Sequence, residues 1–102
     1  KIQMAPQFSW DRRKAVANEA KHDVTFEEAA SVFRDPTAAI FDDNLHSEDE
    51  HRELIIGHSD RHRLLIVSFT ERDDIIRIIS ARAANKREQD GYEQYRKWQS
   101  KQ

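Results

Sequence analysis

The chain has 102 residues and a formal net charge of −2, with 37% hydrophobic and 35% charged residues. This length predicts a single domain, and dense apolar runs such as 64–67 argue against a disordered composition. No apolar stretch approaches the roughly 20 residues that span a bilayer, so we expect no membrane partner. Because the chain has no cysteine, disulfides and thiolate metal sites are excluded, and a cytoplasmic location is expected.

Charge is distributed unevenly along the chain. Residues 41–53 contain six acids against one arginine, whereas residues 71–102 contain eight lysines and arginines against six acids. This separation allows the folded chain to present a basic face in spite of its negative net charge. The alternative is that the charges are scattered over a solvated surface.

Residues 1–7 are expected to form an extension ahead of a single domain at 8–99. A short edge strand is predicted at 8–10. Asp11 then serves as the N-cap of a helix over 12–21, because its carboxylate can accept a hydrogen bond from a backbone N–H at the helix start.

A second helix is predicted after Thr25, since Thr25 and Glu28 have the spacing of a capping box. The helix ends before Pro36, because the residue that precedes a proline is disfavoured in the α region. Four residues of this segment recur at helical spacing and are expected to face the core: Phe26, Ala29, Ala30 and Phe33.

The middle of the chain predicts a meander of four antiparallel strands joined by short connections, at 38–42, 52–57, 64–70 and 74–80. The run 64–70 is apolar on both faces and is expected to lie centrally in the sheet. A last helix is predicted after Asn85, which has the capping-box spacing with Glu88. The order β-α-α-β-β-β-β-α defines an α+β domain with helices packed on one antiparallel sheet.

Several short motifs, in order over about residues 8–95, resemble the BrnT toxins of type II toxin–antitoxin systems. The most specific is Arg-Ile-Ile-Ser-Ala-Arg at 77–82. Asp23 departs from the family pattern, in which glycine follows the Lys-His pair. The other residues that carry the resemblance are 8–11, Lys14, Asn18, 21–22, 25–29, 32–33, 35–36, Glu50, Arg52, 55–57, 70–72, 76–84, 87–88 and Tyr92.

The resemblance implies a RelE-like ribonuclease fold and a cytoplasmic protein that cleaves RNA and blocks translation. It also implies a BrnA-like antitoxin, a ribbon-helix-helix DNA-binding protein. The toxin would contact operator DNA only through their complex, which would repress its own operon. The alternative is a noncatalytic RelE-fold interaction module that acts as a co-repressor, since a fold alone does not establish an activity.

Cleavage of RNA without a metal requires removal of the 2′-OH proton, stabilisation of charge on the phosphorane and protonation of the departing 5′-oxygen. Arginine suits the phosphate because its planar fork binds two oxygens, and histidine suits proton transfer near neutral pH. The candidate catalytic residues are His22, Glu50, Arg52, Arg72 and Arg82, with Glu50 or His22 as the base.

Four further residues are candidates for RNA binding: Lys14, Lys21, Arg77 and Tyr92. Arg77 interrupts an isoleucine-rich strand, so alternation places it on the face opposite Ile76 and Ile78. The alternative role for each arginine is a salt bridge to the acidic segment, and for Tyr92 it is core packing.

No metal or cofactor is expected. The spacing of His46, Glu48, Glu50 and His51 fits neither a helical zinc pair nor an EF-hand, so a solvated loop is the better interpretation. His58 and His62 lie on either side of a predicted hairpin turn. A metal-dependent hydrolase that uses these histidines is a third hypothesis, and a chelator would abolish its activity.

Overall fold

The computed structural model describes residues 6–43 and 50–102, and within them the predicted α+β element order is confirmed. The strands are β1 (Gln7–Ser9), β2 (Ala39–Asp42), β3 (Glu53–His58), β4 (Leu64–Arg72) and β5 (Ile75–Ala83). The helices are α1 (Arg12–His22), α2 (Phe26–Ser31), the 3₁₀ turn η1 (Val32–Arg34) and α3 (Lys86–Ser100). Most of the predicted extension and of the loop at 44–50 lies outside the described residues.

The five strands form one sheet in the order β1-β5-β4-β3-β2, so β4 is central as predicted. Strands β2 to β5 are an antiparallel meander, but β1 pairs with β5 in parallel, which corrects the expectation of a purely antiparallel sheet. A parallel neighbour is possible here because the chain between β1 and β5 is long enough to cross over. Strand β5 also continues three residues past its predicted end at Ser80, since Ala83 pairs with Leu65.

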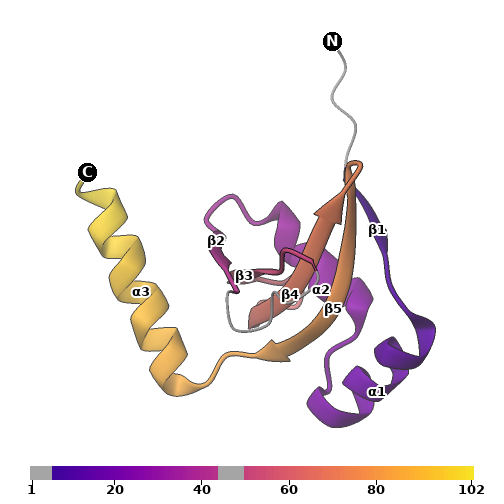
Figure 1. Ribbon diagram of the computed structural model, residues 1–102. Helices are drawn as coiled ribbons and strands as arrows, with labels where there is room; N and C mark the ends of the chain where they lie inside the picture. Colours follow the sequence, from indigo (N-terminus) through magenta and orange to yellow (C-terminus); the bar gives the residue numbers. More distant parts are fainter. Residues whose placement is uncertain (1–5, 44–49) are drawn as a thin grey trace.

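The hydrophobic core lies between one face of the sheet and the helices α1 and α2 (Figure 1). Phe26, Ala29 and Ala30 are buried as predicted, and the partly buried ring of Phe33 packs edge-on against Phe69 at 5.0 Å. The helix α3 lies on the other side of the sheet and stands away from it (Figure 1). On this second face Ile66 and Ser68 are buried while Phe41 is exposed, so the face is covered only in part.

The start of α3 is held by its cap and by a long-range contact with the segment before β2. Asn85 and Glu88 form the predicted capping box. Tyr92 is buried, and its hydroxyl donates a hydrogen bond of 2.7 Å to the carbonyl oxygen of Thr37, just before β2. No described helix, α3 included, combines the length and the apolar character needed to cross a membrane.

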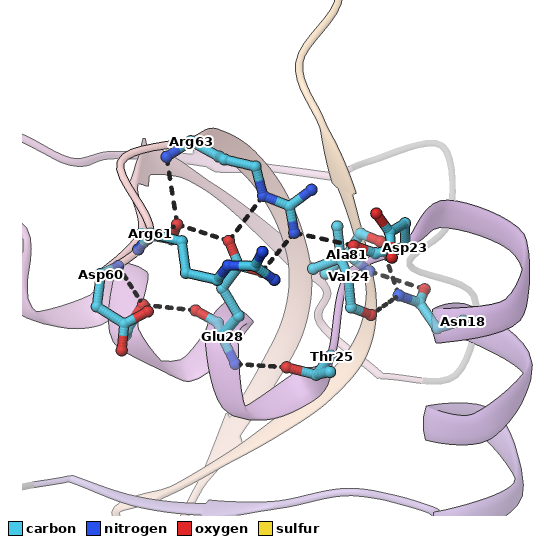
Figure 2. Close-up of polar contacts among 11 residues, drawn as sticks. Asn18, Asp23, Val24, Thr25, Glu28, Asp60, Arg61, Arg63 and Ala81 are labelled. Atoms are coloured by element: carbon cyan, nitrogen blue, oxygen red, sulfur yellow. Dashed lines mark hydrogen bonds and ion pairs between the residues drawn. The ribbon is translucent and has the colours of Figure 1, made fainter.

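A buried carboxylate joins α2 to the turn between β3 and β4 (Figure 2). The side chain of Glu28 is only 3% exposed, and it accepts hydrogen bonds from Nε and Nη2 of Arg63 and from the hydroxyl of Ser59. The hydrogen bonds from Arg63 lower the pKa of Glu28, although burial opposes this shift. The carboxylate is thus charged in the folded protein and fully engaged.

The side chain of Asn18 joins α1 to β5 (Figure 2). Its amide nitrogen donates to the carbonyl oxygens of Ala81 at 2.8 Å and Val24 at 3.0 Å, and its amide oxygen accepts from the backbone N–H of Ala81 at 3.0 Å. Strand β1 pairs only with residues 75–77 of β5. Asn18 therefore provides hydrogen-bond partners for the backbone of Ala81, on the part of the β5 edge that β1 does not reach. The same contacts hold the last turn of α1 beside β5.

Candidate functional site

Four of the predicted site residues line one cavity of about 580 Å³ on the face of the sheet opposite the core. We call it the cationic pocket. Its charged and polar lining comes from α1, β4, β5 and the segments that flank β2 and β3. These residues are Lys21, His22, Asp43, Arg52, Ser68, Ser80 and Arg82.

The position of each cation in the pocket follows from the helix or strand that carries it. Lys21 and His22 belong to the last turn of α1, which Asn18 holds against β5. Arg52 directly precedes β3, and Arg82 is the partner of Ile66 across the ladder between β4 and β5. Successive residues of a strand point to opposite faces, so Arg82 lies on the face opposite the core residue Ala81.

Arg82 is bound to an acid of the chain itself. Its Nη1 and Nη2 donate hydrogen bonds of 2.8 and 2.7 Å to the two carboxylate oxygens of Glu88. The hydrogen bonds from Arg82 lower the pKa of Glu88 to about 2, against the effect of burial. The same pair raises the pKa of Arg82. Its salt-bridge partner is thus Glu88 in α3 and not the acidic segment 41–53 that the sequence suggested.

Three other candidates line a second cavity, of about 640 Å³, at the end of the sheet near the β4–β5 turn. We call it the hairpin pocket, and it contains Glu50, Arg72 and Arg77. The partners of Arg82 and Arg77 on β4 are Ile66 and Thr70, about 13 Å apart along the strand. The structure therefore does not bring Arg72 and Glu50 into the cavity that holds Arg52 and Arg82.

The face predicted for Arg77 is confirmed, since Arg77 is exposed while Ile76 and Ile78 are buried on the core side. Within the described part of the chain, the side chains of Arg72 and Arg77 make no hydrogen bond or ion pair. Both guanidinium groups are thus available to an external anion.

The two remaining candidates lie outside both pockets. Lys14 is exposed in the first turn of α1, where its backbone N–H is capped by Asp11. Tyr92 lies in the first half of α3 and lines a third cavity of about 320 Å³ between α3 and the sheet, which we call the apolar groove. Its lining consists of Phe41, Leu54, Ile56, Ile66, Arg82, Glu88, Gly91, Tyr92 and Tyr95.

The structure also gathers three possible metal ligands that the spacing argument missed. Oxygen or nitrogen atoms of Asp42, His51 and Glu53 lie within 4.8 Å of one another. Asp42 and Glu53 are cross-strand partners on β2 and β3, so their proximity depends on strand register and not on sequence spacing. Asp42 and His51 are exposed, and their contact at 3.0 Å satisfies both side chains without an ion. His46 and Glu48 lie outside the described residues.

Sequence reasoning treated Glu88 only as a helix cap. Its second role, as the partner of Arg82, follows from the sharp connection between the end of β5 and the start of α3. The signal available in the sequence was the placement of an acid six residues after an arginine across a predicted strand-to-helix boundary.

A sequence profile described as "Ribonuclease toxin, BrnT, of type II toxin-antitoxin system" matches residues 10–88. The chain is therefore a ribonuclease toxin of the type II toxin–antitoxin class. Within that class it belongs to the BrnT family.

The crystal structure of the Brucella abortus ribonuclease toxin BrnT is similar to this chain, with a TM-score of 0.62 and 22% sequence identity. The similarity covers 80% of this chain and 100% of that one, and it supports the same α+β fold. A search of curated proteins finds no match. The RelE-like label stays a prediction.

Proposed function

We propose that this protein cleaves RNA in the cationic pocket, without a metal ion, and thereby inhibits translation. The observation that carries the proposal is the convergence of Lys21, His22, Arg52 and Arg82 on one cavity, on the sheet face opposite the core. Three permanent or near-permanent cations around an imidazole form an environment suited to a phosphodiester. Membership of a ribonuclease toxin family supports the same activity.

In this proposal Arg52 and Arg82 bind the non-bridging oxygens of the scissile phosphate and stabilise the charge that develops on them. His22 removes the proton from the 2′-OH, whose oxygen attacks the phosphorus as the bond to the 5′-oxygen breaks. The departing 5′-oxygen takes a proton, for which the ammonium group of Lys21 in the same pocket is the candidate donor. The products are a 2′,3′-cyclic phosphate and a 5′-hydroxyl.

His22 is favoured over Glu50 as the base, because His22 shares a cavity with Arg52 and Arg82 whereas Glu50 lines the hairpin pocket. The hairpin pocket then has a different use. Its two exposed guanidinium groups, Arg72 and Arg77, bind phosphates of the same RNA strand away from the cleavage point.

The proposed partner is a BrnA-like ribbon-helix-helix antitoxin, which contacts operator DNA and represses the operon as a complex with the toxin. The apolar groove is a suitable contact surface, since it is open to solvent and has Arg82 in its lining. A partner side chain of negative charge would complement the cations in the adjoining cationic pocket. Occupation of both cavities by one antitoxin segment would block access of RNA.

The second candidate is a noncatalytic co-repressor that binds the antitoxin and has no nuclease activity. One observation favours it: the guanidinium of Arg82 is already engaged by Glu88. The two functions differ in what happens when the pocket is altered, since a co-repressor does not need His22.

Inducible expression in bacteria, with and without the cognate antitoxin, tests the proposal. We expect growth arrest with the unaltered toxin alone, rescue by the antitoxin, and loss of arrest with His22→Ala. His62→Asn is the matched control, because His62 is an exposed histidine in the turn between β3 and β4, has a φ of 62° that asparagine tolerates, and lines none of the three cavities. Equal growth in every arm would contradict the nuclease function and leave the co-repressor.

A further inference from the structure

The far half of α3 has a surface that the proposed cleavage site does not use. Trp98 is 58% exposed there. Residues 94–102 contain three cations and no acid, and this part of α3 extends away from the sheet (Figure 1). The family profile ends at residue 88, so this surface is not part of the match.

A row of aromatic rings connects this surface to the sheet. The rings of Phe41 and Tyr95 meet edge-on at 5.6 Å, and the rings of Tyr95 and Trp98 lie at 6.1 Å with 32° between their planes. Phe41 and Tyr95 also line the apolar groove, whose wall includes Arg82. The row therefore leads outward along α3 from the apolar groove, which shares Arg82 with the cationic pocket.

The composition around Trp98 is that of a stacking platform for single-stranded nucleic acid. The exposed Lys101 lies one turn further on the same face of α3, and the exposed Lys97 lies beside that face, whereas Arg96 lies on the opposite face. A protein partner is expected to cover a broad apolar patch, whereas a nucleobase needs only one open ring face with cations nearby. No hydrogen bond or ion pair occupies the charged groups of Arg96, Lys97 or Lys101 in the described part of the chain.

We propose that this end of α3 binds single-stranded RNA outside the cleavage point, with one base stacked on Trp98 and phosphates bound by Lys97 and Lys101. The inference rests on the proposed function, because it takes the RNA to be the strand that is cut. It assigns to α3 a role in capturing long substrates. Short RNAs that fill only the cationic pocket would not reach it.

Cleavage of two RNAs tests this site: an unstructured 20-nucleotide strand, and a 4-nucleotide strand that spans the pocket alone. We expect Trp98→Ala to raise KM for the long RNA about tenfold, as for loss of one stacked base, and to leave the short RNA unchanged. The combined variant Lys97→Gln, Lys101→Gln should reduce the slope of log affinity against log salt by about 1.4. Arg96→Gln is the control, since it removes one positive charge from the opposite face of the same helix.

An unchanged KM of Trp98→Ala for the long RNA would overturn the proposal. So would weakened binding of the antitoxin together with unaltered binding of RNA, which would make the surface a protein interface. If the unaltered protein cuts neither RNA, the proposed function fails. Fluorescence anisotropy of the labelled 20-nucleotide strand then decides the α3 site, with weaker binding by Trp98→Ala as the supporting result and equal binding as the contrary one.

Discussion

The guanidinium of Arg82, near the end of β5, and the carboxylate of Glu88, in the first turn of α3, form a two-point ion pair with hydrogen bonds of 2.8 and 2.7 Å. One oxygen of the same carboxylate accepts the backbone N–H of Asn85 and so caps the helix. A single acid thus positions both the start of α3 and a cation of the proposed cleavage site.

This pair predicts a pH dependence of stability. The pKa of Glu88 is about 2 in the folded protein, below the ordinary value of 4.5, so its stabilising contribution is complete above 4.5. The contribution declines as the pH falls from 4.5 toward 2. Glu88→Gln should reduce the loss of stability over this range, while the amide keeps the capping geometry. Urea unfolding at a series of pH values measures the free energy of unfolding of each variant, with Glu93→Gln at an exposed position as control. Equal pH profiles for Glu88→Gln and the unaltered protein would contradict the prediction.

The buried carboxylate of Glu28 predicts a large loss of stability on neutralisation. Glu28→Gln leaves the guanidinium of Arg63 without its charge partner, and we expect the free energy of unfolding at pH 7 to fall by about 3 kcal/mol. The neighbouring Glu27 is exposed in the same helical turn, so Glu27→Gln should change it by less than about 0.5 kcal/mol. Chemical denaturation of both variants checks this, and similar values for the two would refute the role of the network.

Replacement of each of the two glycines by alanine should have opposite effects on stability. A Cβ on Gly57 would lie 2.7 Å from the Cβ of Ala38, so Gly57→Ala should destabilise the protein by about 1–3 kcal/mol. A Cβ on Gly91 meets nothing within 4 Å, and alanine in a helix interior should stabilise by up to about 1 kcal/mol. Thermal unfolding of the two variants should therefore show shifts of opposite sign. Shifts of the same sign would count against this packing.

Asn18 predicts a link between stability and activity. Asn18→Ala leaves buried backbone groups of Val24 and Ala81 unsatisfied, at a cost of about 1–3 kcal/mol. It also releases the last turn of α1, which carries His22, so RNA cleavage should fall at temperatures where the variant is still folded. Glu19→Ala, at an exposed neighbouring position, should keep both stability and cleavage. Full activity of folded Asn18→Ala would show that α1 is held by other contacts.

Much of the fold followed from local signals. Side-chain caps at Asp11, Thr25 and Asn85 all form in the structure, because a side-chain oxygen and a nearby backbone N–H need no distant partner. The capping box predicted for Thr25 and Glu28 is only half formed, since the carboxylate of Glu28 binds Arg63 instead of the N-cap backbone. The parallel pairing of β1 was missed because it depends on a contact across most of the chain. The irregular pairing after Ser68 was also missed, since an extra residue in one strand has no clear mark in the sequence.

Part of the candidate site could likewise be predicted from local information in the sequence. Residue chemistry selected His22, Arg52 and Arg82, which do line one cavity. The separation of Arg72 from them was not predictable, because it depends on the length of β4 and its register with β5. Short-range spacing also gave no warning of the cross-strand contact that brings Asp42 near Glu53.

The most direct test of RNA cleavage in the cationic pocket is the cleavage rate of purified protein on single-stranded RNA in the presence of EDTA. We predict cleavage by the unaltered protein, a rate reduced at least about 100-fold for Arg52→Ala, and an unchanged rate for Arg34→Ala. Arg34 is an exposed arginine of η1 that lines none of the three cavities. Loss of all cleavage in EDTA, or equal rates for the two arginine variants, would contradict the account.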